Sequence, residues 1–182
     1  MDSAEASLRT YATWSSGDEN SLRAEDVPSE KVFQVLLADA IKTNESGHSL
    51  RIRLEVLNAR LVGDAKFAGS EQGRVDIVTY TTTQDEPKHL IEVKGNATPT
   101  TLDADSVVLR QLLKSIGRPV LKGYQLAVLK GHKKESAALG RLESLRDPGL
   151  RQSILERVVE FTDPSTHETF FVGLALFEVA RA

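Results

Sequence analysis

The sequence predicts an α/β (α+β) fold in which a mixed β-sheet is flanked by helices. Strand-like and helix-like segments alternate through the middle of the chain. The 182 residues suffice for one globular domain but fall short of two comfortable ones. Apolar residues make up 40% and charged residues 27%, as in an ordinary folded protein. We expect one domain with an N-terminal extension (1–25), a core (26–130) and a part with C-terminal helices and a β-hairpin (131–182).

The first elements are expected on hydrophobic periodicity. Residues 8–14 are expected to form a strand. A helix that starts at Asp26 or Ser29 and runs to about residue 43 is predicted by apolar side chains at helical spacing. Residues 50–56 alternate apolar and polar side chains, which predicts a half-buried strand. Turn or loop segments are expected at 44–48 and 64–73.

A β-hairpin with a long loop is predicted next, from strand-like runs at 74–80 and 89–95 around a turn-rich segment. The remaining expected elements are a helix over 103–116 ended by Gly117 and Pro119, a strand over 124–129, a polar helix over 133–147, a short helix over 150–157, and paired strands over 158–162 and 169–179.

Composition excludes several classes of protein. No run approaches the ~18 consecutive apolar residues of a membrane span, and the first residues lack the pattern of a secretory signal. The chain has no cysteine, which excludes disulfides, thiolate zinc sites and cysteine nucleophiles. Neither a P-loop nor a serine-hydrolase motif is present. We expect a cytoplasmic protein without a membrane partner.

Charged residues gather at one end of the predicted hairpin. Side chains alternate between the two faces of a strand, so one face is apolar and can pack on helices. That face holds Val75, Ile77, Ile91 and Val93. The other face carries Asp76, Glu92 and Lys94 at the end remote from the turn, and an unbulged hairpin pairs Asp76 with Glu92. Two carboxylates and an ammonium group are therefore expected to converge.

Such a pair of carboxylates is costly, because the charges repel and partial burial removes water from them. A divalent cation removes both costs, and oxygen ligands alone favour Mg²⁺ or Mn²⁺ over zinc. Such an ion polarises a phosphodiester and lowers the pKa of water, and Lys94 is placed to orient that water or to stabilise developing charge. The alternative is a cross-strand ion pair on a solvated sheet face.

The segments Arg74-Val75-Asp76-Ile77-Val78 and Leu90-Ile91-Glu92-Val93-Lys94-Gly95 resemble the PD-(D/E)XK nuclease superfamily, which includes restriction enzymes, Holliday-junction resolvases and RecB-like exonucleases. The resemblance covers roughly residues 26–130, with Val75 where a proline often stands. It implies a restriction-endonuclease-like core and Mg²⁺-dependent hydrolysis of DNA, and by analogy a setting in phage defence or restriction. The motif E-x-K also occurs at Glu86-Pro87-Lys88, and D-x-K at Asp64-Ala65-Lys66, but both lie in turn or loop segments.

The resemblance also implies two supporting residues. An acidic residue on the first helix often completes the metal site, and Glu30 is the best match. The alternative is a first-turn glutamate favoured by the helix dipole, and Glu55 is a competitor for the same role. Some branches use a glutamine on the helix after the hairpin, which Gln111 matches. The alternative for Gln111 is the solvated face of an ordinary amphipathic helix.

A basic tract follows the predicted site. Residues 106–134 contain no acidic side chain and hold seven basic ones, Arg110, Lys114, Arg118, Lys122, Lys130, Lys133 and Lys134. Such a tract can follow a phosphate backbone, although the net charge of −3 argues against indiscriminate coating of nucleic acid. Aromatic residues are scarce there, which favours duplex DNA over stacked single strands.

The leading hypothesis is a Mg²⁺-dependent endonuclease or exonuclease, with a homodimer or a partner subunit supplying targeting. One alternative is a catalytically inactive nuclease-fold module that binds nucleic acid or a protein partner. Another is an interaction protein of unrelated α/β fold, in which the charged residues form a surface ion pair.

Overall fold

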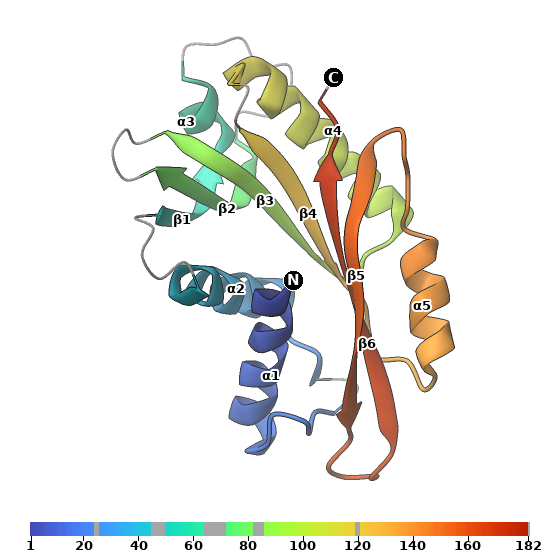
Figure 1. Cartoon of the computed structure of the whole chain (residues 1–182). Helices are drawn as coiled ribbons and strands as arrows, with labels where there is room; N and C mark the ends of the chain where they lie inside the picture. Colours follow the sequence, from blue (N-terminus) through green and yellow to red (C-terminus); the bar gives the residue numbers. More distant parts are fainter. Residues whose placement is uncertain (24–25, 45–49, 64–71, 82–85, 119–120, 182) are drawn as a thin grey trace.

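The computed structural model describes residues 1–23, 26–44, 50–63, 72–81, 86–118 and 121–181. These residues form a mixed sheet of six strands in the order β1-β2-β3-β4-β6-β5 (Figure 1). The pair β3–β4 is parallel and the other pairs are antiparallel. The strands are β1 (Leu50–Leu57), β2 (Arg74–Thr81), β3 (Pro87–Gly95), β4 (Lys122–Val128), β5 (Arg151–Thr162) and β6 (Thr169–Val179).

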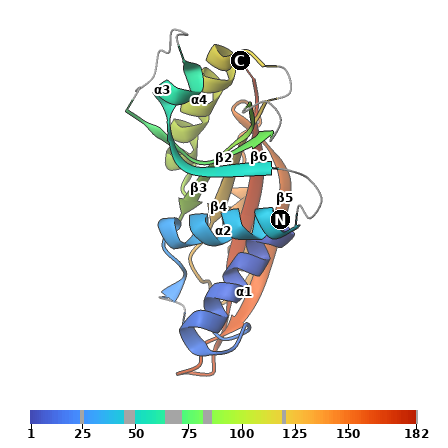
Figure 2. The ribbon, with the colours of Figure 1, turned by 90° about the vertical axis from the view of Figure 1, so that its left-hand side faces the viewer.

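Helices cover both faces of this sheet (Figures 1 and 2). The described helices are α1 (Asp2–Ser16), α2 (Glu30–Asn44), α3 (Asn58–Val62), α4 (Pro99–Ile116) and α5 (Glu135–Glu143). Helices α1 and α2 pack on one face, and α3, α4 and α5 pack on the other. The predicted fold class, a mixed sheet flanked by helices, is thereby confirmed. Within the described residues, no helix is long and apolar enough to span a membrane.

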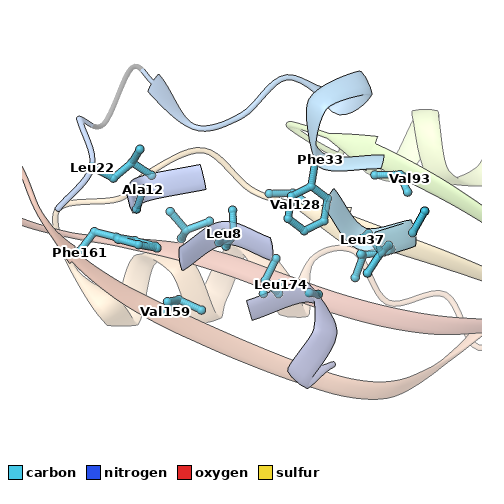
Figure 3. Close-up of a cluster of buried hydrophobic side chains, with 14 of the residues drawn as sticks. Leu8, Ala12, Leu22, Phe33, Leu37, Val93, Val128, Val159, Phe161 and Leu174 are labelled. Carbon is cyan, nitrogen blue, oxygen red and sulfur yellow. The ribbon is translucent and has the colours of Figure 1, made fainter. Parts of the chain in front are cut away.

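The core beneath α1 and α2 is the largest apolar cluster (Figure 3). Ala4, Leu8 and Ala12 of α1 recur at i, i+4 spacing and are buried. They meet side chains from α2 and from the strands, including Phe33, Leu37, Val93, Val128, Val159, Phe161 and Leu174. The segment that was expected as an N-terminal extension therefore supplies part of the core.

Two of the predicted elements are wrong. Residues 8–14 form part of helix α1 rather than a strand, because their buried side chains follow a helical spacing. Residues 151–157 belong to strand β5 rather than to a short helix, because β5 pairs with β6 along its whole length. A register shift between Ser153 and Leu155 breaks the alternation by which a strand is recognised.

The other elements differ only in their bounds. Helix α4 starts at Pro99 rather than at residue 103, because the Thr98 hydroxyl accepts a hydrogen bond from the Thr101 amide in a capping box. It ends at Gly117, whose φ is 68°, as predicted. Residues 45–48, 64–71 and Pro119, which include most of the expected turn and loop segments, lie outside the described residues.

Candidate active site

The central hairpin has the predicted register at its site end, but it is not unbulged as predicted, because the pairing shifts by one residue between Thr79 and Tyr80. Strands β2 and β3 pair Ile77 with Ile91 and Val78 with Leu90, so Asp76 falls beside Glu92. The Val93 amide donates a hydrogen bond of 2.8 Å to Asp76 Oδ2. The carboxylate thus accepts from the backbone of β3, which fixes the Asp76 side chain between the two strands.

Asp76 and Glu92 form a buried carboxyl pair. Their side chains are hydrogen-bonded to each other, and the two residues are only 7% and 9% exposed. Burial raises the pKa of Glu92 well above its usual range, and the negative charges of Asp76 and Asp105 raise it further. Burial also raises the pKa of Asp76, against the Val93 hydrogen bond, which lowers it. Two carboxyl groups in contact require a shared proton or a shared cation.

Lys94 is held by two other carboxylates. Its Nζ atom lies 3.1 Å from Asp105 Oδ2 and 3.7 Å from Glu30 Oε2. Burial lowers the pKa of Lys94, but the charges of Asp105, Glu30 and Glu92 outweigh burial and raise it overall. The pKa of Asp105 is itself raised by burial, although Lys94 opposes this. The geometry keeps Lys94 charged and restrains the position of its ammonium group.

Glu30 stands at the start of α2, where it ties this helix to the end of β3. The Gly95 amide donates a hydrogen bond of 3.2 Å to Glu30 Oε2. Across the described part of the chain, no three histidine, cysteine, aspartate or glutamate side chains are grouped so that they could hold a metal ion. Glu30 thus lies beside Lys94 and apart from the carboxyl pair.

Glu55, the competitor for the role of Glu30, has a different environment. The Gln34 amide donates to the Asp76 carbonyl oxygen and, at 3.2 Å, to Glu55 Oε1. Glu55 is also ion-paired with Lys31. Its φ of 53° lies in the left-handed region. On the neighbouring strand β2, Val75 packs in the cluster under α4 and Ile77 in the cluster under α1 and α2, so the prediction that these two residues share one apolar face is wrong.

A pocket of about 400 Å³ opens next to this site. Glu30, Gly95, Asn96 and Lys130 lie in its wall. Asn96 is another non-glycine residue with left-handed backbone, with a φ of 50°. Strained backbone is concentrated at functional sites in many proteins. Glu30, which is ion-paired with Lys94, therefore lies in the wall of this pocket.

Helix α4 places Asp105, which was not predicted, in the site, and it places the predicted residue Gln111 away from the site. Gln111 lies six residues beyond Asp105, about 9 Å along the helix axis. It makes no hydrogen bond or ion pair with the residues that the structure describes. Asp105 was not predicted, because its proximity to Lys94 depends on how α4 packs against β3. The one sequence signal was an acidic residue just before the basic tract.

The predicted basic tract is divided between two ends of the sheet. Lys130, Lys133 and Lys134 follow the end of β4, which runs parallel to β3 beside Lys94. The other four basic residues lie on α4 or near its end, namely Arg110, Lys114, Arg118 and Lys122. Ion pairs join Arg118 to Glu86, Lys122 to Glu178 and Lys133 to Glu168, at 2.5, 3.1 and 3.1 Å. Three of the seven cations are thus partly neutralised.

The two other matches to the E-x-K and D-x-K motifs are not part of the candidate site in the residues that the structure describes. Glu86, of Glu86-Pro87-Lys88, is ion-paired with Arg118 at the outer end of β3. Asp64-Ala65-Lys66 lies outside the described residues.

Comparisons of the chain with protein-family models, with curated proteins and with solved structures find no match.

Proposed function

We propose that this chain is a metal-dependent nuclease that hydrolyses phosphodiester bonds of DNA. The observation that carries the proposal is the buried contact between Asp76 and Glu92, with the charged Lys94 restrained beside them. An ordinary cross-strand ion pair does not account for this arrangement. Both carboxyl groups are buried, and the ion pairs of Lys94 run to Asp105 and Glu30.

The carboxyl pair fits a divalent cation of the magnesium type. Its donors are oxygen atoms only, and their like charges are costly to bury without a proton or a cation. Asp76 and Glu92 would hold Mg²⁺ or Mn²⁺. Glu30, which is ion-paired with Lys94, would become a further ligand only if its carboxylate turned from Lys94 toward the ion. When bound, the ion supplies Lewis-acid stabilisation of the phosphodiester and favours deprotonation of water.

The residues of the chain have distinct tasks in this proposal. The positive charge of Lys94 would stabilise the phosphate oxygens, whose negative charge increases in the transition state. Asp105 is a positioning residue, because its ion pair restrains the Lys94 ammonium group and keeps it protonated. Gln34 fixes the backbone of Asp76 through the Asp76 carbonyl oxygen. Lys94 therefore acts as a cation rather than as a proton acceptor.

Several coarser features belong to the same proposal. A chain without cysteine forms no disulfide, which suits the cytoplasm, where proteins rarely depend on disulfides for stability. A homodimer or a partner subunit would supply targeting, and phage defence or restriction is the setting in which such a nuclease is useful.

Plasmid cleavage tests the proposal. Wild-type protein is incubated with supercoiled plasmid in Mg²⁺, in Mn²⁺ and in EDTA, next to Glu92→Gln and Lys94→Ala. Lys88→Ala is the matched control, because Lys88 belongs to the motif match at Glu86. Cleavage is expected with either metal for the wild type and for Lys88→Ala, and is expected to be lost in EDTA and in both site variants. Cleavage that survives Glu92→Gln contradicts the proposal, and DNA binding without cleavage indicates an inactive nuclease-fold module.

A further inference from the structure

A buried pair of polar side chains joins helix α4 to strand β4. Ser106 on α4 is 0% exposed and Gln125 on β4 is 1% exposed. The Ser106 hydroxyl donates a hydrogen bond of 2.8 Å to Gln125 Oε1. Gln125 Nε2 donates a second hydrogen bond, also of 2.8 Å, to the carbonyl oxygen of Leu102. One glutamine amide therefore contacts two points on α4 that are about one helical turn apart.

The serine of this pair stands where an apolar side chain is expected. The buried face of α4 consists of Ser106 and four leucines, Leu102, Leu109, Leu112 and Leu113. A buried polar side chain costs free energy unless it is hydrogen-bonded, and an apolar pair of similar shape would be about as stable. Apolar contacts have no direction, whereas hydrogen bonds require a defined geometry. The polar pair therefore contributes a defined position of α4 on the sheet more than it contributes stability.

The polar pair adjoins the candidate active site. Gln125 stands beside Glu92 in the parallel pairing of β3 and β4, about 4.8 Å away across the sheet. Ser106 directly follows Asp105, whose Oδ2 lies 3.1 Å from Lys94 Nζ. An α-helix rises about 1.5 Å and turns by about 100° per residue, so a shift of α4 by one residue would carry the Asp105 carboxylate away from Lys94. The position of α4 on the sheet thus decides whether this ion pair forms.

We infer that Gln125 and Ser106 are positioning residues, which hold α4 in the one position on the sheet that places Asp105 beside Lys94. Both residues act through Asp105, because their hydrogen bonds fix the turn of α4 that carries it. Only their effect on DNA cleavage rests on the proposed nuclease function. The position of α4 is a property of the fold and can be measured without DNA.

Cleavage kinetics test this inference with a variant that loses both hydrogen bonds. Ser106→Ala/Gln125→Met leaves no unpaired polar side chain, so its Tm is expected to stay within about 4 °C of the wild type. Its kcat for plasmid cleavage in Mg²⁺ is expected to fall about tenfold, with KM changed less than about twofold. Leu112→Met, a volume-conserving change of a buried residue on the same helix, is the matched control, and its kcat is expected to stay within about twofold of the wild type.

A double-mutant cycle shows whether the polar pair acts through Asp105. In the Asp105→Asn background the ion pair is already lost, so Ser106→Ala/Gln125→Met is expected to lower kcat by less than about twofold further. A further tenfold loss in that background, or an equal loss of kcat in Leu112→Met, overturns the inference. If the double variant does not fold, Ser106→Ala is measured alone, with an expected loss of about threefold in kcat.

NMR spectroscopy measures the ion pair without a cleavage assay. The ammonium protons of a lysine held in an ion pair exchange slowly with water and give a ¹H–¹⁵N signal, which Lys94→Ala assigns by its absence. This signal is expected in the wild type and in Leu112→Met, and is expected to be lost in Asp105→Asn and in Ser106→Ala/Gln125→Met. A Lys94 signal that is absent from the wild type, or unchanged in the double variant, overturns the inference. Wild-type protein that cleaves no DNA, while the double variant loses the signal, removes the nuclease proposal and leaves the inference standing.

Discussion

Replacing Glu92 by glutamine is expected to stabilise the metal-free protein. Asp76 and Glu92 are hydrogen-bonded and only 7% and 9% exposed, so water screens their repulsion poorly. Two unit charges about 4 Å apart repel by about 4 kcal/mol at an effective dielectric constant of 20. A shared proton relieves part of this cost near neutral pH. The free energy of unfolding is therefore expected to rise by about 1 to 3 kcal/mol at about pH 8.

The pH dependence gives the sign of this effect. Burial raises the pKa of Glu92 in the folded state, so between the unfolded and folded pKa values the native protein binds more protons. Stability of the wild type therefore falls as the pH rises through that window. The glutamine variant has no such titration, and its advantage is expected to vanish below about pH 4, where the unfolded carboxyl is also protonated.

Urea and thermal unfolding at several pH values measure the difference. For a chain of this length, 1 kcal/mol corresponds to about 2–4 °C in Tm. Glu160→Gln, on the exposed side of β5, is the control and is expected to change stability by less than about 0.5 kcal/mol. A Glu92→Gln protein that is less stable than the wild type at high pH, or whose difference does not depend on pH, would refute the reasoning.

Two further predictions concern neighbouring features. Asp105→Asn is expected to lower kcat for DNA cleavage about 10- to 100-fold with little change in KM, because Lys94 loses its restraint. Steady-state kinetics measures this effect, and Asp105→Glu is expected to restore part of kcat. An effect on KM alone would contradict the prediction. Gly173→Ala is expected to destabilise the protein by about 1–3 kcal/mol, because the new Cβ would lie 2.8 Å from Leu129 Cδ1. Gly140→Ala, in open space on α5, is its control and is expected to stabilise by about 0.5–1 kcal/mol; equal effects on urea unfolding would contradict the packing argument.

The central hairpin could be predicted because its evidence is local. Alternating β-branched residues on both sides of a turn-rich segment fix two strands and their register, and the observed pairing of Ile77 with Ile91 follows. Helix α1 was missed because its buried face relies on small alanines, whose hydrophobic signal is weak. Strand β5 was missed because Leu150 and Ile154 also fit helical spacing, and pairing with the distant β6 decides the outcome.

Only the part of the site that lies on the two hairpin strands could be predicted from the sequence. The contact of Asp76 with Glu92 follows from strand parity and register. The position of Asp105 depends on how α4 packs against β3, which no local pattern in the sequence shows. Counting charges also overstated the basic tract, because glutamates far away in the sequence pair with three of its members.

Calorimetric titration with Mn²⁺ is the most direct test of the carboxyl pair as a metal site. The wild type is expected to bind the ion at one site, with proton release as the shared proton leaves the pair. Asp76→Asn and Glu92→Gln are each expected to abolish that heat, while Glu160→Gln retains it. Wild-type protein that binds no Mn²⁺, or a Glu92→Gln variant that binds it as tightly as the wild type, would contradict the assignment.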